Sequence, residues 1–281
     1  MLENHRPKKR LGQHFLVNGR IADRIVDSAS IGSEDIVLEI GPGKGILTGR
    51  LLNKSRMVFA VEIDPELSAV LRKYFGNCKG FRLVEADILG VDLPGLLRNV
   101  SRKITVVSNL PYNISTPVIE YLIKNRKLVE RAVLMVQKEV ACRYLAQPGS
   151  KDYGLTTLNL ALCARGKKIM DVKPGSFNPP PEVMSSVVTF SFSEEYLYPL
   201  GSEDIFRTVT GAAFRQRRKM VHNTLIPYFI STGIPEPKAR ELLISTGINP
   251  RARPESLEVE DFVKISNAFE QVLSTNSGSE R

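Results

Sequence analysis

Four short apolar runs, each followed by a polar or glycine-containing segment, constrain the fold of this chain more than any other feature. They lie at residues 36–40, 57–61, 81–84 and 104–107. Short β-branched runs of this kind are typical of buried parallel strands. Helical spacing of apolar residues follows at 46–52 and again from residue 115. Alternation of strands and helices predicts a doubly wound α/β sheet.

The pattern changes near residue 192. Before it, further strand patterns lie at 131–136, 168–172 and 185–192, with a helical pattern at 153–164. We therefore expect a mostly parallel sheet with a late antiparallel element. After a linker at 193–202, strand patterns disappear. The expected divisions are a sheet domain at 1–192 with a basic N-terminal arm, a helical domain at 203–273 and a disordered polar tail at 274–281.

The segment Asn109-Leu-Pro-Tyr112 carries the residue types needed to hold a planar base that bears an amine. A carboxamide, a proline and an aromatic ring directly follow a strand, at the edge where open α/β sheets bind ligands. Ser115 and Thr116 are candidate N-caps for the next helix, with Pro117 suited to its first turn. Alone, the tetrapeptide also fits an ordinary strand-to-helix loop, because Asn and Pro are common in turns.

A glycine-rich loop, Gly41-Pro-Gly-Lys-Gly45, follows the first run. Glycines let the backbone approach a ligand closely, and a helix start turns free N–H groups toward it. The second run ends in Glu62-Ile-Asp64, about 20 residues further on, where an acidic side chain can hold the ribose of a nucleoside cofactor. The dinucleotide-binding pattern is not met, because Ile46 stands where its last glycine should be.

Taken in order, these motifs resemble those of class I S-adenosylmethionine-dependent methyltransferases, in the branch that modifies adenine N6. The matching segments are Glu39-Ile-Gly-Pro-Gly-Lys-Gly45, Glu62-Ile-Asp64, Ala86-Asp87 and Asn109-Leu-Pro-Tyr112. Further matches narrow the resemblance to the KsgA (RsmA) family of ribosomal RNA adenine dimethyltransferases, from near residue 7 to near residue 270. They are Arg10-Leu-Gly-Gln-His-Phe-Leu16, Gln137-Lys-Glu-Val140, Phe177-Asn-Pro-Pro-Pro181, Ser185-Ser-Val-Val188 and Phe214-Arg-Gln-Arg-Arg-Lys219.

The resemblance implies a Rossmann-like, mostly parallel seven-stranded sheet with a small C-terminal all-helical domain. It implies an enzyme that dimethylates N6 of two adjacent adenosines near the 3′ end of small-subunit ribosomal RNA, using S-adenosylmethionine and releasing S-adenosylhomocysteine. The expected partner is this RNA within a small ribosomal subunit or its precursor, bound by a monomer during ribosome biogenesis. Two alternatives stay open: a large-subunit RNA adenine methyltransferase of the antibiotic-resistance type, and a non-catalytic RNA-binding or assembly relative.

The family's pattern also assigns roles to individual residues of this chain. The cofactor-binding set that it implies is His14, Leu16, Gly41, Glu62, Asp87 and Asn109. His14 departs from the pattern, because many members carry Asn there. On the substrate side, the Asn109 side-chain oxygen and the Leu110 carbonyl would accept the two N–H bonds of the adenine amine. Tyr112 would stack on the base and Phe177 would close its opposite side.

A net charge of +9 and a pI near 9.5 favour a polyanionic partner. Basic residues cluster near both ends of the 281-residue chain. The candidate RNA contacts are Lys8, Lys9, Arg10, Arg215, Arg217, Arg218 and Lys219. For any one of them, a solvated surface charge is the ordinary alternative.

Other features of the composition limit the remaining classes of function. The three cysteines lack metal-ligand spacing and the three histidines are scattered, so we expect reduced thiols and no metal site. No run of eighteen apolar residues occurs, and no apolar signal region follows the basic N-terminus. We therefore expect a cytoplasmic protein with no membrane partner.

Overall fold

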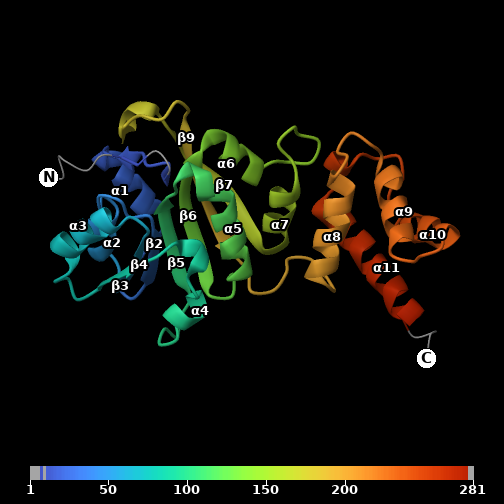
Figure 1. The fold of residues 1–281 in the computed structure, drawn as a ribbon, viewed down its shortest axis with the longest axis horizontal. Helices are drawn as coiled ribbons and strands as arrows, with labels where there is room; N and C mark the ends of the chain where they lie inside the picture. Colours follow the sequence, from blue (N-terminus) through green and yellow to red (C-terminus); the bar gives the residue numbers. More distant parts are fainter. Residues whose placement is uncertain (1–6, 9–10, 278–281) are drawn as a thin grey trace. The chain divides into compact units, whose positions relative to one another are not determined.

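A computed structural model describes residues 7–8 and 11–277, and the chain divides into two compact units (Figure 1). The sheet unit runs to Leu145 and resumes over Ala164–Glu194, whereas the helical unit comprises Ala146–Cys163 and the chain from Glu195 onward. This division differs from the expected one, because residues 146–163 join the helical unit. The reason is packing: Leu158 and Leu162 are buried in the same core as Phe206 and Phe229.

The sheet unit is built on seven strands in the order β4-β3-β2-β5-β6-β9-β7. These are β2 (Ile36–Ile40), β3 (Met57–Glu62), β4 (Phe81–Glu85), β5 (Ile104–Asn109), β6 (Val129–Gln137), β7 (Ala164–Val172) and β9 (Ser185–Phe192). The first five run parallel to one another, and β9 pairs antiparallel with both β6 and β7. The predicted fold class is confirmed. Because the chain passes from β2 outward to β4 and then returns to β5, the order reverses beside β2, where such sheets bind ligands.

Helices cover both faces of this sheet (Figure 1). They are α1 (Gly19–Ser28), α2 (Thr48–Leu52), α3 (Pro65–Phe75), α4 (Leu93–Leu96), α5 (Ser115–Lys124) and α6 (Lys138–Tyr144), with short 3-10 turns η2 (Ile88–Gly90), η3 (Tyr112–Ile114) and η4 (Pro174–Ser176). Ile25 of α1 and Leu51 of α2 pack into one buried cluster with Val37 and Val133 of the sheet.

The predicted caps of α5 are wrong. The turn η3 leads directly into this helix, so Ile114 takes the N-cap position and no side chain caps it. Ser115 is already the first helical residue, and its hydroxyl donates to the Pro111 carbonyl at 3.4 Å. The turn therefore carries the chain from the end of β5 into α5 without a capping residue.

A short ladder ties the N-terminal segment to the chain that precedes β9. β1 (Phe15–Leu16) pairs antiparallel with β8 (Phe177–Asn178), with Leu16 opposite Phe177. Both of these side chains are buried in the cluster that α1 and α2 share with the sheet. Their burial anchors the segment just before β1, which contributes one wall of the site described below.

The helical unit contains α7 (Leu155–Cys163), α8 (Glu203–Phe214), α9 (Val221–Ser231), α10 (Glu236–Ser245), the turn η5 (Pro254–Ser256) and α11 (Val259–Ser277). Its core is rich in aromatic rings, and Phe229 stacks on Phe269 with ring centroids 4.7 Å apart. Helix α11 continues through residues 274–277, which were predicted to begin a disordered tail, and 278–281 lie outside the described residues. No described helix is both long and apolar enough to span a membrane.

Candidate active site

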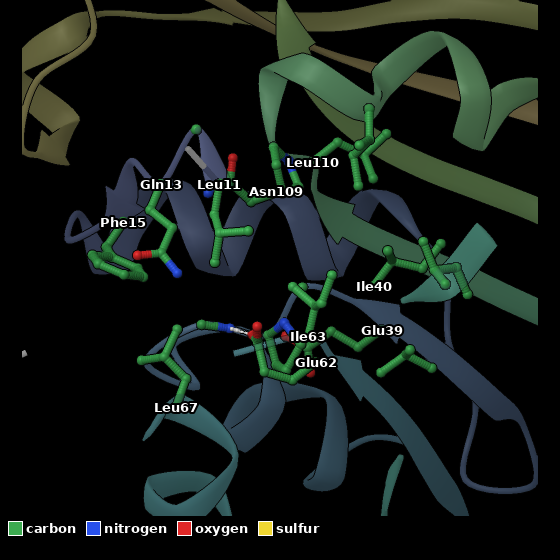
Figure 2. Close-up of a pocket in the computed structure, with 18 of the residues that line it drawn as sticks. Leu11, Gln13, Phe15, Glu39, Ile40, Glu62, Ile63, Leu67, Asn109 and Leu110 are labelled. Carbon is green, nitrogen blue, oxygen red and sulfur yellow. Dashed lines mark hydrogen bonds between the residues drawn. The ribbon is translucent and has the colours of Figure 1, made fainter. Parts of the chain in front are cut away.

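A cavity of about 210 Å³ lies at the carboxyl ends of β2, β3, β4 and β5 (Figure 2). The segment before β1, the glycine loop and the segment that contains η3 form its walls. Most of the residues that the sequence singled out for cofactor or base lie here together: His14, Leu16, Gly41, Glu62, Asp87, Asn109, Leu110 and Tyr112. The strand ends thus meet at one site, as the doubly wound topology predicts.

The glycine loop presents main chain to the cavity. Gly41 and Gly43 have φ angles of 63° and 57°, in the left-handed region that side-chain-bearing residues rarely adopt. A Cβ atom on Gly43 would lie 3.1 Å from Cδ1 of Phe15, so the N-terminal segment passes directly against the loop. Glycine is required here both for backbone conformation and for this close approach.

Glu62, at the end of β3, has a fixed orientation. Its Oε2 accepts the main-chain N–H of Gly43 at 3.1 Å and its Oε1 accepts that of Asp64 at 2.9 Å. Burial raises the pKa of Glu62, and these hydrogen bonds act in the opposite direction. Main-chain N–H groups on both sides therefore hold this carboxyl in place in the cavity wall.

Glu39, the last residue but one of β2, lies in the cavity wall with only 1% of its surface exposed. The Thr48 hydroxyl donates to Oε2 at 2.7 Å, whereas Oε1 accepts no hydrogen bond from the described residues. Burial raises the pKa of this carboxyl to about 8, although the Thr48 hydrogen bond lowers it. The sequence analysis did not select Glu39 as a site residue. A carboxylate inside an apolar strand was the signal that could have identified it.

Asp64 fastens the N-terminal segment beside the cavity. It is 1% exposed, and it accepts hydrogen bonds from Lys8 Nζ at 2.7 Å and Gln13 Nε2 at 3.1 Å. The Lys8 main-chain N–H donates in turn to Gln13 Oε1 at 2.8 Å. Burial acts to raise the pKa of Asp64, but the hydrogen bonds from Lys8 and Gln13 outweigh it and the pKa is lowered. We call Lys8, Gln13 and Asp64 the N-terminal latch.

Asn109, at the end of β5, is oriented by the N-terminal segment. Its Nδ2 donates to the main-chain carbonyl of His14 at 3.0 Å, so its Oδ1 is turned away from that carbonyl. The next residue, Leu110, donates its own N–H to the Met135 carbonyl of β6 at 3.0 Å. Figure 2 shows Asn109 and Leu110 on the side of the cavity opposite Glu62.

Tyr112 is held at its face and at its hydroxyl. Its ring stacks on the His14 ring, with centroids 5.3 Å apart and planes inclined by 26°, and its hydroxyl lies 2.8 Å from Ser185 Oγ. Burial raises the pKa of Tyr112, so its hydroxyl stays neutral.

Phe177, which the resemblance places opposite Tyr112 across the base, does not line this cavity and packs beside Leu16 in the core. It lies opposite Leu16 in the β1–β8 ladder, and both side chains are buried.

The predicted RNA contacts fall into three groups. Lys8 is paired with Asp64 and, at 2.9 Å, with Glu66, whereas Lys9 and Arg10 lie outside the described residues. Arg217 is also paired within the protein: its Nε is 2.8 Å from Glu255 Oε2, and its Nη2 donates to the Ser150 carbonyl at 2.9 Å. The three that are exposed are Arg215, Arg218 and Lys219.

The model of the family described as Ribosomal RNA adenine dimethylase matches residues 4–271. This chain belongs to the ribosomal RNA adenine dimethylase family. The chain is similar to the Ribosomal RNA small subunit methyltransferase A of Geobacter metallireducens. The two are 40% identical over 268 residues, which cover 95% of this chain and 97% of that protein.

Solved structures agree with this assignment. The crystal structure of a dimethyladenosine transferase from Plasmodium falciparum is similar to this dimethylase with a TM-score of 0.79 and 30% identity, covering 92% of this chain and 98% of that one. The crystal structure of the 23S rRNA methyltransferase ErmE has a TM-score of 0.68 and 23% identity, covering 92% and 100%. The likeness to ErmE shows a shared fold.

Within residues 7–8 and 11–277, no cluster of three or more His, Cys, Asp or Glu side chains could hold a metal ion.

Proposed function

We propose that this protein transfers methyl groups from S-adenosylmethionine to N6 of two adjacent adenosines near the 3′ end of small-subunit ribosomal RNA. The observation that carries the proposal is the single cavity shared by the glycine loop, the acidic strand ends and the 109–112 segment. Relatives at 36–41% identity over nearly the full chain are named for the small subunit. The large-subunit alternative is supported by fold alone, through ErmE at 23% identity.

The cavity wall fits this cofactor in three respects. The positive φ angles of Gly41 and Gly43 bring main chain close to where a methionine moiety would lie. The unpartnered Oε1 of Glu39 is a buried acceptor that a positively charged ligand would satisfy. Glu62, which main-chain N–H groups hold in the cavity wall, is the ribose ligand, and Asp87, just after β4, is the adenine ligand. When bound, S-adenosylmethionine supplies an electrophilic methyl group on a positively charged sulfur.

The residues beyond β5 prepare the adenine amine for this methyl. The amine is a poor nucleophile because its lone pair is delocalised into the ring. Asn109 Oδ1 and the Leu110 carbonyl accept its two N–H bonds, which favours the pyramidal nitrogen whose lone pair points at the methyl and offsets the positive charge that develops. Tyr112 provides the stacking surface for the base.

Alignment supplies much of the acceleration in this proposal. The amine needs no strong base before transfer, because its proton becomes acidic only once nitrogen has gained the methyl. Holding methyl and nitrogen in line can contribute ~7–11 kcal/mol. Extracting the target base from its stack costs a few kcal/mol, roughly, which contacts with the RNA offset.

Methyl transfer to purified ribosomal subunits tests the proposal. The full chain is incubated with labelled S-adenosylmethionine and small subunits that lack the modification, and the RNA is digested to nucleosides. We expect label in N6,N6-dimethyladenosine. Label confined to large subunits would overturn the proposal in favour of the resistance-type enzyme. Cofactor binding with no transfer above a heat-inactivated control would overturn it in favour of a non-catalytic relative.

A further inference from the structure

We propose that His14 is a positioning residue for the target base, acting through Tyr112 and Asn109, rather than the cofactor ligand that the family's pattern suggests. The inference rests on the proposed adenosine substrate. His14 contacts three segments of the chain around the site. Its ring stacks on Tyr112, its Nδ1 lies 2.9 Å from the Pro179 carbonyl, and its own carbonyl accepts from Asn109.

The hydrogen bond to Pro179 fixes the imidazole. A carbonyl can only accept, so Nδ1 carries the proton and donates it. His14 directly precedes β1 and Pro179 directly follows β8, so this hydrogen bond lies at the end of that ladder. The buried Leu16–Phe177 pair anchors the same ladder. The ring is therefore held in one orientation by a rigid element.

This ring covers one face of Tyr112. The two ring centroids lie 5.3 Å apart, within the range in which stacked aromatic pairs attract. Ser185 holds the Tyr112 hydroxyl at 2.8 Å. A base can then stack on a platform whose plane and edge are both fixed, rather than on a ring free to rotate.

The main chain of His14 acts on the second part of the site. Its carbonyl accepts Asn109 Nδ2, so it selects the amide orientation that leaves Oδ1 for the substrate amine. Tyr112 sets where the base plane lies and Asn109 sets where its amine points. Because His14 contacts both, base plane and amine acceptor keep a constant relative geometry. Replacing the side chain removes only the first of these effects, since the carbonyl remains.

His14→Ala and His14→Phe separate the ring from its hydrogen bond. Both are compared with the wild-type chain at saturating S-adenosylmethionine, on undermethylated small subunits, for kcat, KM and the ratio of mono- to dimethyladenosine. Calorimetry with S-adenosylhomocysteine measures cofactor-site affinity. We expect His14→Ala to lower kcat by about tenfold and to raise the monomethyl share, with affinity for S-adenosylhomocysteine within about twofold of wild type. His14→Phe keeps a flat ring against Tyr112 and should retain most of kcat.

His222 provides a matched control in the helical unit. Its Nδ1 lies 2.7 Å from the Pro250 carbonyl, the same kind of anchor that His14 has, so His222→Ala should keep wild-type kcat and methyl ratio. Thermal unfolding confirms that each variant is folded. If His14→Ala does not fold, His14→Leu replaces it as the variant without a flat ring.

Three results would overturn the inference. They are a wild-type kcat for the variant without a ring, a His14→Phe variant as slow as that one, and a tenfold loss of S-adenosylhomocysteine affinity with unchanged kcat. The wild-type chain tests the proposed function separately, because a wild type that transfers no methyl to small subunits fails before any variant is compared.

Discussion

At the scale of single residues, the proposed mechanism gives the Asn109 carboxamide the most direct part in the chemistry. Its nitrogen donates to the His14 carbonyl, and its oxygen is the acceptor that we propose for the amine. Asn109→Ala should lower the single-turnover rate of methyl transfer by about 10²–10³, or ~2.7–4 kcal/mol, because an oriented acceptor is lost in the transition state. Asn53→Ala, at an exposed position after α2, is the matched control. A rate close to wild type for Asn109→Ala would exclude the role given to this oxygen.

The buried carboxyl of Glu39 should couple cofactor binding to a proton. With a pKa of about 8, it holds its proton at pH 7 while the cavity is empty. A positively charged ligand beside it favours the ionised form, so its pKa falls and S-adenosylmethionine binding should release up to one proton below about pH 8. Above that pH the carboxyl is already ionised and no proton is released. Calorimetry in two buffers of different ionisation enthalpy measures this number.

Glu39→Gln identifies the source of that proton. Burial also raises the pKa of Glu62, so a second carboxyl could contribute. If Glu39 is the source, the variant should bind with equal heat in both buffers. Persistent proton release from the variant would assign the linkage to Glu62.

At the scale of elements, the strands could be read from the sequence and the N-terminal latch could not. β2, β3 and β5 end within two residues of their predicted ends, because a short apolar run bounded by glycine or polar residues has few other solutions. The strand ends therefore placed Glu62 and Asn109 correctly in one cavity. Lys8 looked like a phosphate contact because local charge was the only signal. Its pairing with Asp64 depends on two segments that meet only in the folded chain.

The place of Phe177 could not be read from the sequence for a related reason. Its motif suggested an aromatic ring beside the substrate base, but motif spacing does not report which side of a strand faces the core. That orientation comes from the register of the β1–β8 ladder, which sets Phe177 opposite Leu16. A two-residue ladder between segments so far apart in sequence leaves no periodicity to detect.

The N-terminal latch should affect cofactor affinity. Asp64→Asn removes the charge that Lys8 meets, while Asn can still cap α3 as Asp64 does. We expect the Kd for S-adenosylhomocysteine to rise about fivefold to tenfold, since roughly 1 kcal/mol of hydrogen bonding that helps to hold Gln13 in the cavity wall is lost. Calorimetry measures the change. Asp23→Asn, which breaks an exposed ion pair with Arg50, is the control and should bind normally. Equal affinity for both variants would remove the latch from the binding mechanism.

At the scale of the whole molecule, the net charge could be predicted from the sequence, whereas the boundary between the two units could not. The net charge of +9 is a sum over the chain and could be read directly. The boundary between the units could not, because 146–163 joins the helical unit through side-chain packing across a gap in sequence. Leu158 and Leu162 look like any buried helix face until the core that they enter is known. Contacts between distant segments also decide which charges remain available.

Arg217 and Arg218 are neighbours in sequence with different expected roles. Arg217 joins the end of α8 to Glu255 and to the Ser150 carbonyl within the helical unit, whereas Arg218 is exposed. Arg218→Ala should weaken RNA binding and reduce the slope of log K against log salt by about 1, with little change in unfolding. Arg217→Ala should instead lower the free energy of unfolding by ~1 kcal/mol and leave that slope nearly unchanged. Salt titration of RNA binding and denaturant unfolding, run on both variants, distinguish the two. If Arg217→Ala reduced the slope without destabilising the fold, its ion pair with Glu255 would have to open on the RNA, and the positive charge would count toward phosphate binding after all.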